Sequence, residues 1–95
     1  MSLSHQTLTL YASATVQINP IAGTIPDYCE GMTLSVQNLH ASNYVYLGNS
    51  GTSSVSYGFR LAPGQAWSID LDPSDAILAA TNGTSSIAIT RLFWQ

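Results

Sequence analysis

The 95-residue sequence predicts an all-β protein, a small antiparallel β-sandwich or jelly-roll-like barrel of about seven strands. Two observations lead to this fold class. Apolar and polar residues alternate in several short runs, which is typical of strands with one buried face. Glycine, proline and asparagine turn signals separate these runs at intervals of roughly 8 to 12 residues. No long run shows the 3.6-residue period of a helix, so we expect one β domain over residues 1–95.

The N-terminal third contains one predicted strand and one predicted loop. Apolar residues occupy every even position of residues 8–18, which predicts a single strand with one buried face. Residues 1–6 precede this pattern and are expected to be flexible. Residues 19–31 contain two prolines and two glycines, which break regular structure, so we expect a long loop or arm there.

Three further strands are expected in the middle of the chain. Alternation resumes in residues 32–36, and residues 44–47 are aromatic and β-branched, as strands favour. Residues 55–61 alternate again. The polar segments 38–43 and 48–54 are predicted to be turns because they combine asparagine, serine and glycine.

The C-terminal third contains turn signals with a defined chemistry. Pro63 and Gly64 occupy the two central positions that a type II turn favours, so a hairpin-like reversal is expected before a strand at residues 67–71. A turn, or one turn of helix, is expected at residues 72–75.

The last two expected strands flank the strongest hairpin signal of the chain. This signal is Asn82-Gly83, which favours a tight two-residue turn. A short apolar run at residues 77–80 comes before it, and residues 86–91 alternate after it.

Composition excludes several classes of function. Apolar residues make up 45% of the chain and charged residues only 7%, a combination that favours folding over disorder. The formal net charge is −3, and the only basic side chains besides histidine are Arg60 and Arg91. Because phosphate binding needs clustered lysine and arginine, we expect no nucleic-acid partner. No membrane span and no signal peptide are predicted, so the protein is expected to be made in the cytoplasm.

We expect no enzyme activity and no cofactor. Cys29 is the only cysteine, which rules out an intrachain disulfide and a multi-cysteine zinc site. His5 and His40 are not spaced as metal ligands on one helix face would be. Cys29 lies beside Glu30, and an acidic neighbour does not favour the reactive thiolate.

Three aspartates are the most concentrated charge in the sequence. Asp70, Asp72 and Asp75 are candidate calcium ligands, because carboxylates at alternate strand positions point to the same face. The segment lacks the glycine and the terminal glutamate of a calcium-binding EF-hand loop. A solvated strand edge is therefore the favoured interpretation, and we predict no metal.

Aromatic residues are frequent for so short a chain. A sandwich of this size needs a few of them in its core, and Trp67 is the natural core candidate. Since the chain carries so little charge, we expect part of its surface to be covered by neighbouring molecules. The residues predicted to form an interface or ligand face are Tyr28, Tyr44, Tyr46, Tyr57 and Trp94.

Four strand and turn motifs follow one another between residues 32 and 91: Val36-Gln37-Asn38-Leu39, Tyr44-Val45-Tyr46-Leu47-Gly48, Leu61-Ala62-Pro63-Gly64 and Ile69-Asp70-Leu71. This order of motifs resembles that of small virion proteins of tailed bacteriophages. The resemblance implies a β-sandwich head accessory protein, that is, a capsid decoration or cement subunit. It further implies that the protein resides in the virion and that its partners are further copies of itself, with a trimer favoured, and the major capsid protein or another virion protein.

A second hypothesis is a carbohydrate- or receptor-binding module of the kind found in tail fibres. It would use Tyr44, Tyr46 and Trp67 on an open face of the sandwich, because sugar-binding surfaces combine aromatic rings with asparagine and glutamine.

Overall fold

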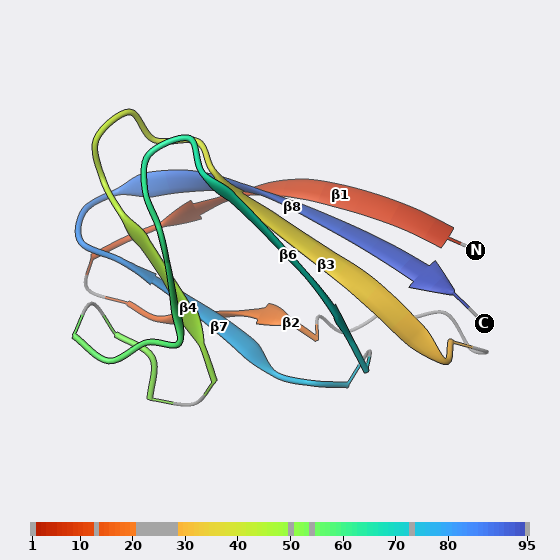
Figure 1. Ribbon diagram of the computed structural model, residues 1–95. Coiled ribbons are helices and arrows are strands. Elements are labelled where there is room, and N and C mark those ends of the chain that lie inside the picture. The colour runs from red at the N-terminus through yellow and green to blue at the C-terminus, as the bar shows by residue number, and fades with distance from the viewer. Residues whose placement is uncertain are drawn as a thin grey trace.

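The structure is a computed structural model that describes residues 2–12, 14–20, 29–49, 51–53, 55–72 and 74–94. Within these ranges eight strands form two four-stranded antiparallel sheets that pack face to face, which confirms the predicted all-β sandwich (Figure 1). The strands are β1 Ser2–Leu10, β2 Val16–Asn19, β3 Gly31–Asn38, β4 Val45–Gly48, β5 Phe59–Leu61, β6 Ala66–Leu71, β7 Ile77–Thr81 and β8 Ser85–Trp94. The described residues contain no helix long and apolar enough to cross a membrane.

The strand order is that of a jelly roll. The first sheet has the order β1-β8-β3-β6 and the second has the order β2-β7-β4-β5. The first strand therefore pairs with the eighth, the second with the seventh, the third with the sixth and the fourth with the fifth. This is the pattern of one long hairpin rolled up on itself, which gives the two Greek keys of the jelly roll.

Most turns of this fold carry the chain from one sheet to the other. Only the β4–β5 connection joins two strands of the same sheet. The predicted hairpin at Asn82-Gly83 is accordingly wrong, since this turn leads from β7 in the second sheet to β8 in the first. Gly83 does not have the positive φ of a tight hairpin turn. It packs closely against the β3–β4 turn instead, since a Cβ atom there would lie 2.6 Å from the side-chain Nδ2 of Asn43.

The strand predicted over residues 8–18 is two strands in different sheets. β1 ends at Leu10, the Ala14 amide donates a 3.1 Å hydrogen bond to the Tyr11 carbonyl in the corner, and β2 begins at Val16. Leu10 and Ile18 are both fully buried in the same core, but they approach it from opposite sides. The alternation of apolar and polar residues therefore continues across the corner, so the sequence pattern does not show that one strand ends and another begins there.

Two other segments differ from the sequence-based expectations. Residues 2–6, expected to be flexible, form the first half of β1 and pair with the end of β8, beginning at Ser2 opposite Phe93. The predicted strand at residues 55–61 is shortened to the three residues of β5. The expected arm at residues 19–31 ends in β3 at Gly31, and its central residues 21–28 lie outside the described residues.

The core lies between the two sheets and is built from alternate residues. β8 shows this most regularly, since every second residue from Ser85 to Phe93 is buried. The turn predicted at residues 62–65 is confirmed: the Gln65 amide donates a 2.9 Å hydrogen bond to the Ala62 carbonyl, and Gly64 has a φ of 78°. It does not close a hairpin, because it leads from β5 in the second sheet to β6 in the first. The buried apolar cluster consists of Leu10, Ile18, Met32, Leu34, Val36, Val45, Leu47, Leu61, Ala79, Ile87, Ile89 and Phe93.

Candidate functional site

Three of the five predicted interface residues come together on the outer face of the second sheet. Within β4, Val45 and Leu47 point into the core, so Tyr46 between them points outward. Arg60 of β5 is directly opposite Tyr46 in the strand register and therefore lies on the same outer face. The short hairpin β4–β5 thus displays an aromatic and a cationic side chain next to each other.

Ring contacts tie these side chains into one group, which we call the tyrosine–arginine patch: Tyr44, Tyr46, Tyr57 and Arg60. The rings of Tyr46 and Tyr57 are tilted against each other with their centroids 4.8 Å apart. The Arg60 Cζ atom lies 4.9 Å from the centroid of the Tyr44 ring, within the range of a cation–π interaction. Tyr46 is only 8% exposed, whereas Tyr57 is 44% exposed and, together with the exposed Arg60, forms the accessible part of the patch.

Arg60 is the one arginine that the protein presents to solvent. The chain has two lysine or arginine residues in total, and the other, Arg91, is buried. Among the described residues, no carboxylate forms an ion pair with Arg60, and the Arg60 guanidinium lies over the Tyr44 ring. Its guanidinium N–H groups are therefore available to an acceptor from another molecule.

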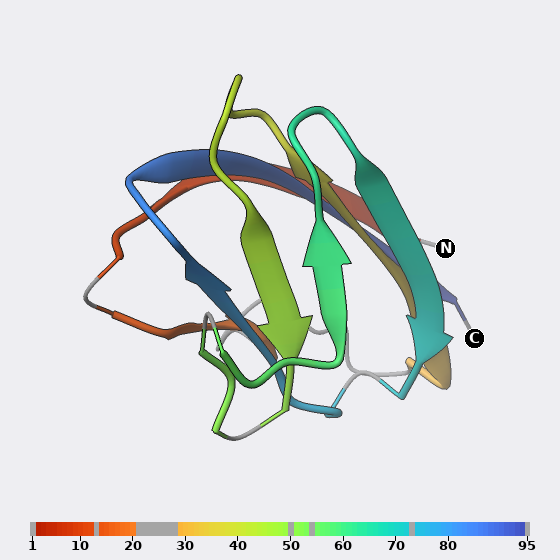
Figure 2. The ribbon, with the colours of Figure 1, turned by 60° about the vertical axis from the view of Figure 1, so that its left-hand side comes forward.

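An apolar cleft lies on the other side of β5, between the edge strands of the two sheets. β5 and β6 run next to each other in opposite directions where the sandwich opens (Figure 2). The Phe59 and Trp67 rings face each other across this opening with centroids 5.5 Å apart. The cleft has a volume of about 470 Å³ and is lined by Leu47, Gly48, Asn49, Gly58, Phe59, Trp67, Ile69 and Ile77.

The loop between β4 and β5 adds an exposed apolar residue. The Ser53 hydroxyl oxygen accepts 3.2 Å hydrogen bonds from the amides of Val55 and Ser56, which orders the tip of the loop. Val55 is 90% exposed on this ordered turn. We call the tyrosine–arginine patch, the cleft and Val55 together the β5 surface.

The β5 surface holds much of the exposed apolar area. Of the seven exposed large hydrophobic side chains among the described residues, four belong to it: Val55, Tyr57, Phe59 and Ile69. Exposed apolar side chains gathered around one strand mark an interaction site more often than single scattered residues do.

Of the two remaining predicted face residues, Trp94 does not join this surface. Trp94 is on the outer face of the first sheet, where its ring lies 2.7 Å from the position of a Cβ on Gly31, opposite it in β3. Tyr28 lies outside the described residues. Trp67 lines the cleft, whereas Tyr44 and Tyr46 are on the outer face of the second sheet. These three residues therefore do not form the single open platform that the carbohydrate hypothesis requires.

The three candidate calcium ligands have hydrogen-bond partners of other kinds. The Thr33 hydroxyl donates a 2.6 Å hydrogen bond to Asp70, and the Ser74 hydroxyl donates a 2.7 Å bond to Asp72. Asp75 accepts a bond from the backbone amide of Asp72. The part of the chain that the structure describes contains no group of three or more His, Cys, Asp or Glu side chains that could hold a metal.

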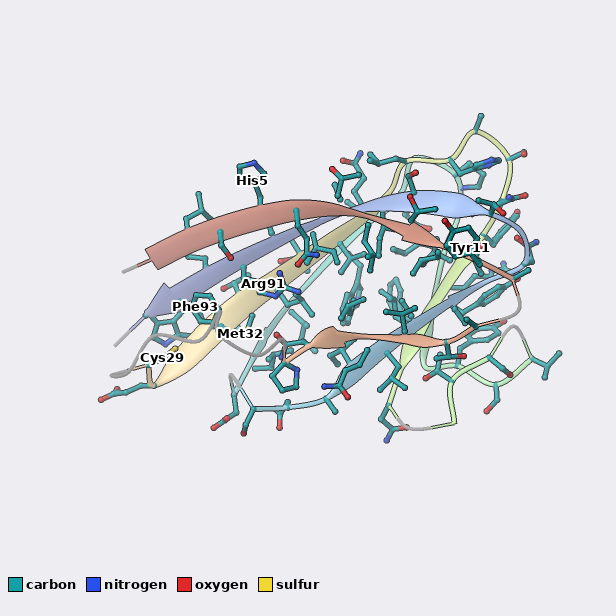
Figure 3. The ribbon with its side chains drawn as sticks, turned by 180° about the vertical axis from the view of Figure 1, so that it is seen from behind. His5, Tyr11, Cys29, Met32, Arg91 and Phe93 are labelled. Atoms are coloured by element: carbon teal, nitrogen blue, oxygen red, sulfur yellow. The ribbon has the colours of Figure 1, made fainter. Side chains whose placement is uncertain are left out.

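The histidines and the cysteine are engaged locally. His5 projects from β1 toward solvent (Figure 3). The Nδ1 atom of His40 accepts hydrogen bonds from the amides of Ser42 and Asn43, at 3.0 and 2.9 Å, and so stabilises the β3–β4 turn. The Cys29 thiol donates to the Gly31 carbonyl at 3.1 Å.

Sequence reasoning missed one residue of structural importance, the buried Arg91. It lies between β1 and β2 (Figure 3), where Nη1 donates a 2.7 Å hydrogen bond to Gln6 Oε1 and Nη2 donates to the Ile18 carbonyl. Burial lowers the pKa of Arg91 from its ordinary value, since desolvation disfavours the charged form. A signal was present: Arg91 has the same parity in β8 as the buried Ile87 and Ile89.

Comparison with known proteins adds no assignment. No family model matches the chain, and no curated protein matches it either. A proposal of function therefore depends on the jelly-roll topology and on the β5 surface.

Proposed function

We propose that the protein is a structural subunit of a virus particle, of the type that decorates the capsid of a tailed bacteriophage, and that it acts by protein–protein contacts. The observation that carries this proposal is the β5 surface. Tyrosine, tryptophan, phenylalanine and arginine are enriched at protein interfaces, and all four meet around β5. Arg60 stacked on an aromatic ring is a typical anchor of such contacts.

The fold and the composition support the same class of function. Jelly rolls are the fold of many viral capsid domains, although lectins use the fold as well. Only 7% of the residues are charged, a low value for a surface that stays in water. Neighbouring subunits in a particle would cover part of this surface.

The partners that follow from this proposal are further copies of the chain, with a trimer favoured, and the major capsid protein or another virion protein. The protein would then reside in the virion. Repeated copies on a symmetric particle each contribute the same contact, so that a modest interface is multiplied across the assembly.

Co-sedimentation with capsids tests the proposal. Expanded capsids are assembled from the major capsid protein of a tailed bacteriophage whose genome encodes this chain, and the bound fraction is measured against protein concentration. We expect saturable binding, and at least tenfold weaker binding for Tyr57→Ala, because interface tyrosines often contribute more than about 1.4 kcal/mol. Ser68→Ala is the matched control, since Ser68 is also exposed but lies on β6 of the first sheet. A wild-type protein that does not bind these capsids contradicts the proposal.

The second candidate is a carbohydrate-binding module, and one observation favours it. The Tyr57 ring is 44% exposed and is held in place by Tyr46, as a platform for a sugar ring would be. A glycan array decides between the two functions. A specific hit that is lost in Tyr57→Ala would replace the capsid proposal, whereas the virion subunit binds no free glycan.

A further inference from the structure

We propose that the tyrosine–arginine patch of one copy binds the acidic turn that follows β6 in a second copy, so that the subunits associate head to tail. The acidic turn is defined here by Asp72, Ser74 and Asp75. This inference rests on the proposed function, because it names the surface through which the virion subunit self-associates.

The patch is arranged to bind a carboxylate, with Arg60 as the hydrogen-bond donor. Arg60 stacks on the Tyr44 ring, and a guanidinium held by its face keeps its N–H groups directed sideways. Two parallel N–H groups of the guanidinium can then donate hydrogen bonds to the two oxygens of one carboxylate. Tyr57, partly exposed beside it, supplies apolar surface that would exclude water from the ion pair.

The acidic turn presents its carboxylates in a fixed arrangement. Asp72 Oδ1 accepts hydrogen bonds from the Ser74 amide at 2.9 Å and from the Ser74 hydroxyl at 2.7 Å. Asp75 Oδ2 accepts a 3.2 Å bond from the Asp72 amide. Among the described residues, these bonds leave Asp72 Oδ2 and Asp75 Oδ1 without a partner. The Ser74 bonds also lower the pKa of Asp72, which keeps its carboxylate ionised.

Charge complementarity points to a second copy as the occupant. Arg60 is the only lysine or arginine outside the core, and the acidic turn lies beside Asp70 in the most acidic part of the described surface. Among the residues that the structure describes, no ion pair joins these two groups within one molecule. Each copy therefore offers one positive and one negative surface, and pairing between copies satisfies both.

The symmetry of the assembly follows from the two surfaces being different. Contacts between unlike surfaces are heterologous, and they produce a closed ring or an open chain rather than a twofold dimer. A closed ring around an axis is the form that fits a symmetric capsid site. Because the contact includes an ion pair, its affinity should fall as salt concentration rises.

Charge exchange tests the pairing. The dissociation constant for self-association is measured by sedimentation velocity for the full chain. Arg60→Glu and the double variant Asp72→Arg/Asp75→Arg should each weaken association at least tenfold. The triple variant that combines these changes should return to within about threefold of the wild-type value. Ser68→Ala is the matched control, because Ser68 is exposed on β6 but carries no charge, and it should leave association unchanged.

Several outcomes overturn the inference. They are a wild-type protein that stays monomeric at hundreds of micromolar, an Arg60→Glu variant that associates normally, and a triple variant that does not recover. Arg60→Lys is a more conservative change that keeps the positive charge but removes the paired N–H donors of the guanidinium, and it should weaken association by several fold. Capsid binding is measured separately, so a failed charge exchange with intact capsid binding refutes this inference and leaves the proposed function standing.

Discussion

The long strands of the first sheet and the short β4–β5 hairpin of the second sheet contribute differently to the molecule. β1, β8 and β3 of the first sheet are eight to ten residues long and pair along almost their whole length. β4 and β5 of the second sheet have only four and three residues, yet their side chains form the tyrosine–arginine patch. Long pairing with alternate burial stabilises the fold, whereas a short edge hairpin leaves side chains free for recognition.

The outer faces of the two sheets repeat this contrast. On the first sheet, small hydroxyl residues pair across the strands: Ser35 bonds to Ser68 at 3.0 Å and Thr33 bonds to Asp70. These polar groups satisfy one another. On the second sheet, aromatic rings and an arginine without a carboxylate partner among the described residues occupy the corresponding positions. The comparison predicts that mutations in the long strands of the first sheet change stability, whereas mutations on the outer face of the second sheet change binding.

The largest effect is expected for Leu34→Ala in the long strands. Leu34 is fully buried in β3 between β8 and β6, so the substitution removes core contacts and leaves a cavity. We expect a loss of about 3 kcal/mol in the free energy of unfolding, measured by urea denaturation. Thr33→Ala in the same strand faces outward and should cost less than about 1 kcal/mol. Similar losses for the two variants would contradict the inside–outside assignment of β3.

The two arginines provide the next comparison. Arg91→Ala should lower the free energy of unfolding by about 2 kcal/mol, because Gln6 and the Ile18 carbonyl lose the donor between the sheets. Arg60→Ala should change stability by less than about 0.5 kcal/mol, since Arg60 is exposed. Thermal and urea unfolding of both variants check this. An Arg60 variant as unstable as the Arg91 variant would place Arg60 among the groups that hold the fold.

The smallest effect is expected at the acidic turn. Ser74→Ala removes the hydroxyl bond that is the main cause of the lowered pKa of Asp72, so this pKa should rise toward its ordinary value. Because the folded-state pKa is depressed, its contribution to stability is present above the unfolded pKa and is lost as pH falls through the folded pKa. NMR titration of the Asp72 carboxyl carbon measures the shift. Ser68→Ala, which removes a bond to another serine, should leave the Asp72 titration unchanged.

The fold class was predictable because alternation is a local property of a strand. Met32 to Val36 and Trp67 to Leu71 alternate in the sequence and lie in β3 and β6. The division into sheets was not predictable in the same way. A turn such as Asn82-Gly83 has the residues of a hairpin, yet the strands on either side of it belong to different sheets. The residues of a turn predict that the chain changes direction there, but they do not predict with which strand the next strand pairs.

The candidate site was predictable in part. Tyr44 and Tyr46 were expected on a face because they are two residues apart in an aromatic strand. Tyr57 was expected in a strand, but it reaches Tyr46 from the end of the β4–β5 loop. The position of Arg60 opposite Tyr46 depends on the strand register, which no local pattern in this sequence reveals.

The pairing of β1 with β8 also has a consequence for how the chain folds. The partners Ser2 and Phe93 are almost the whole sequence apart, and β3 also depends on β8 for one of its two neighbours. During synthesis the first sheet therefore has no completed centre until β8 has left the ribosome. Folding should be a slow event in the millisecond-to-second range typical of proteins dominated by non-local pairing. Until that event, β1 and β3 are strands without their main partner, and protecting them from other chains is a problem for the nascent protein.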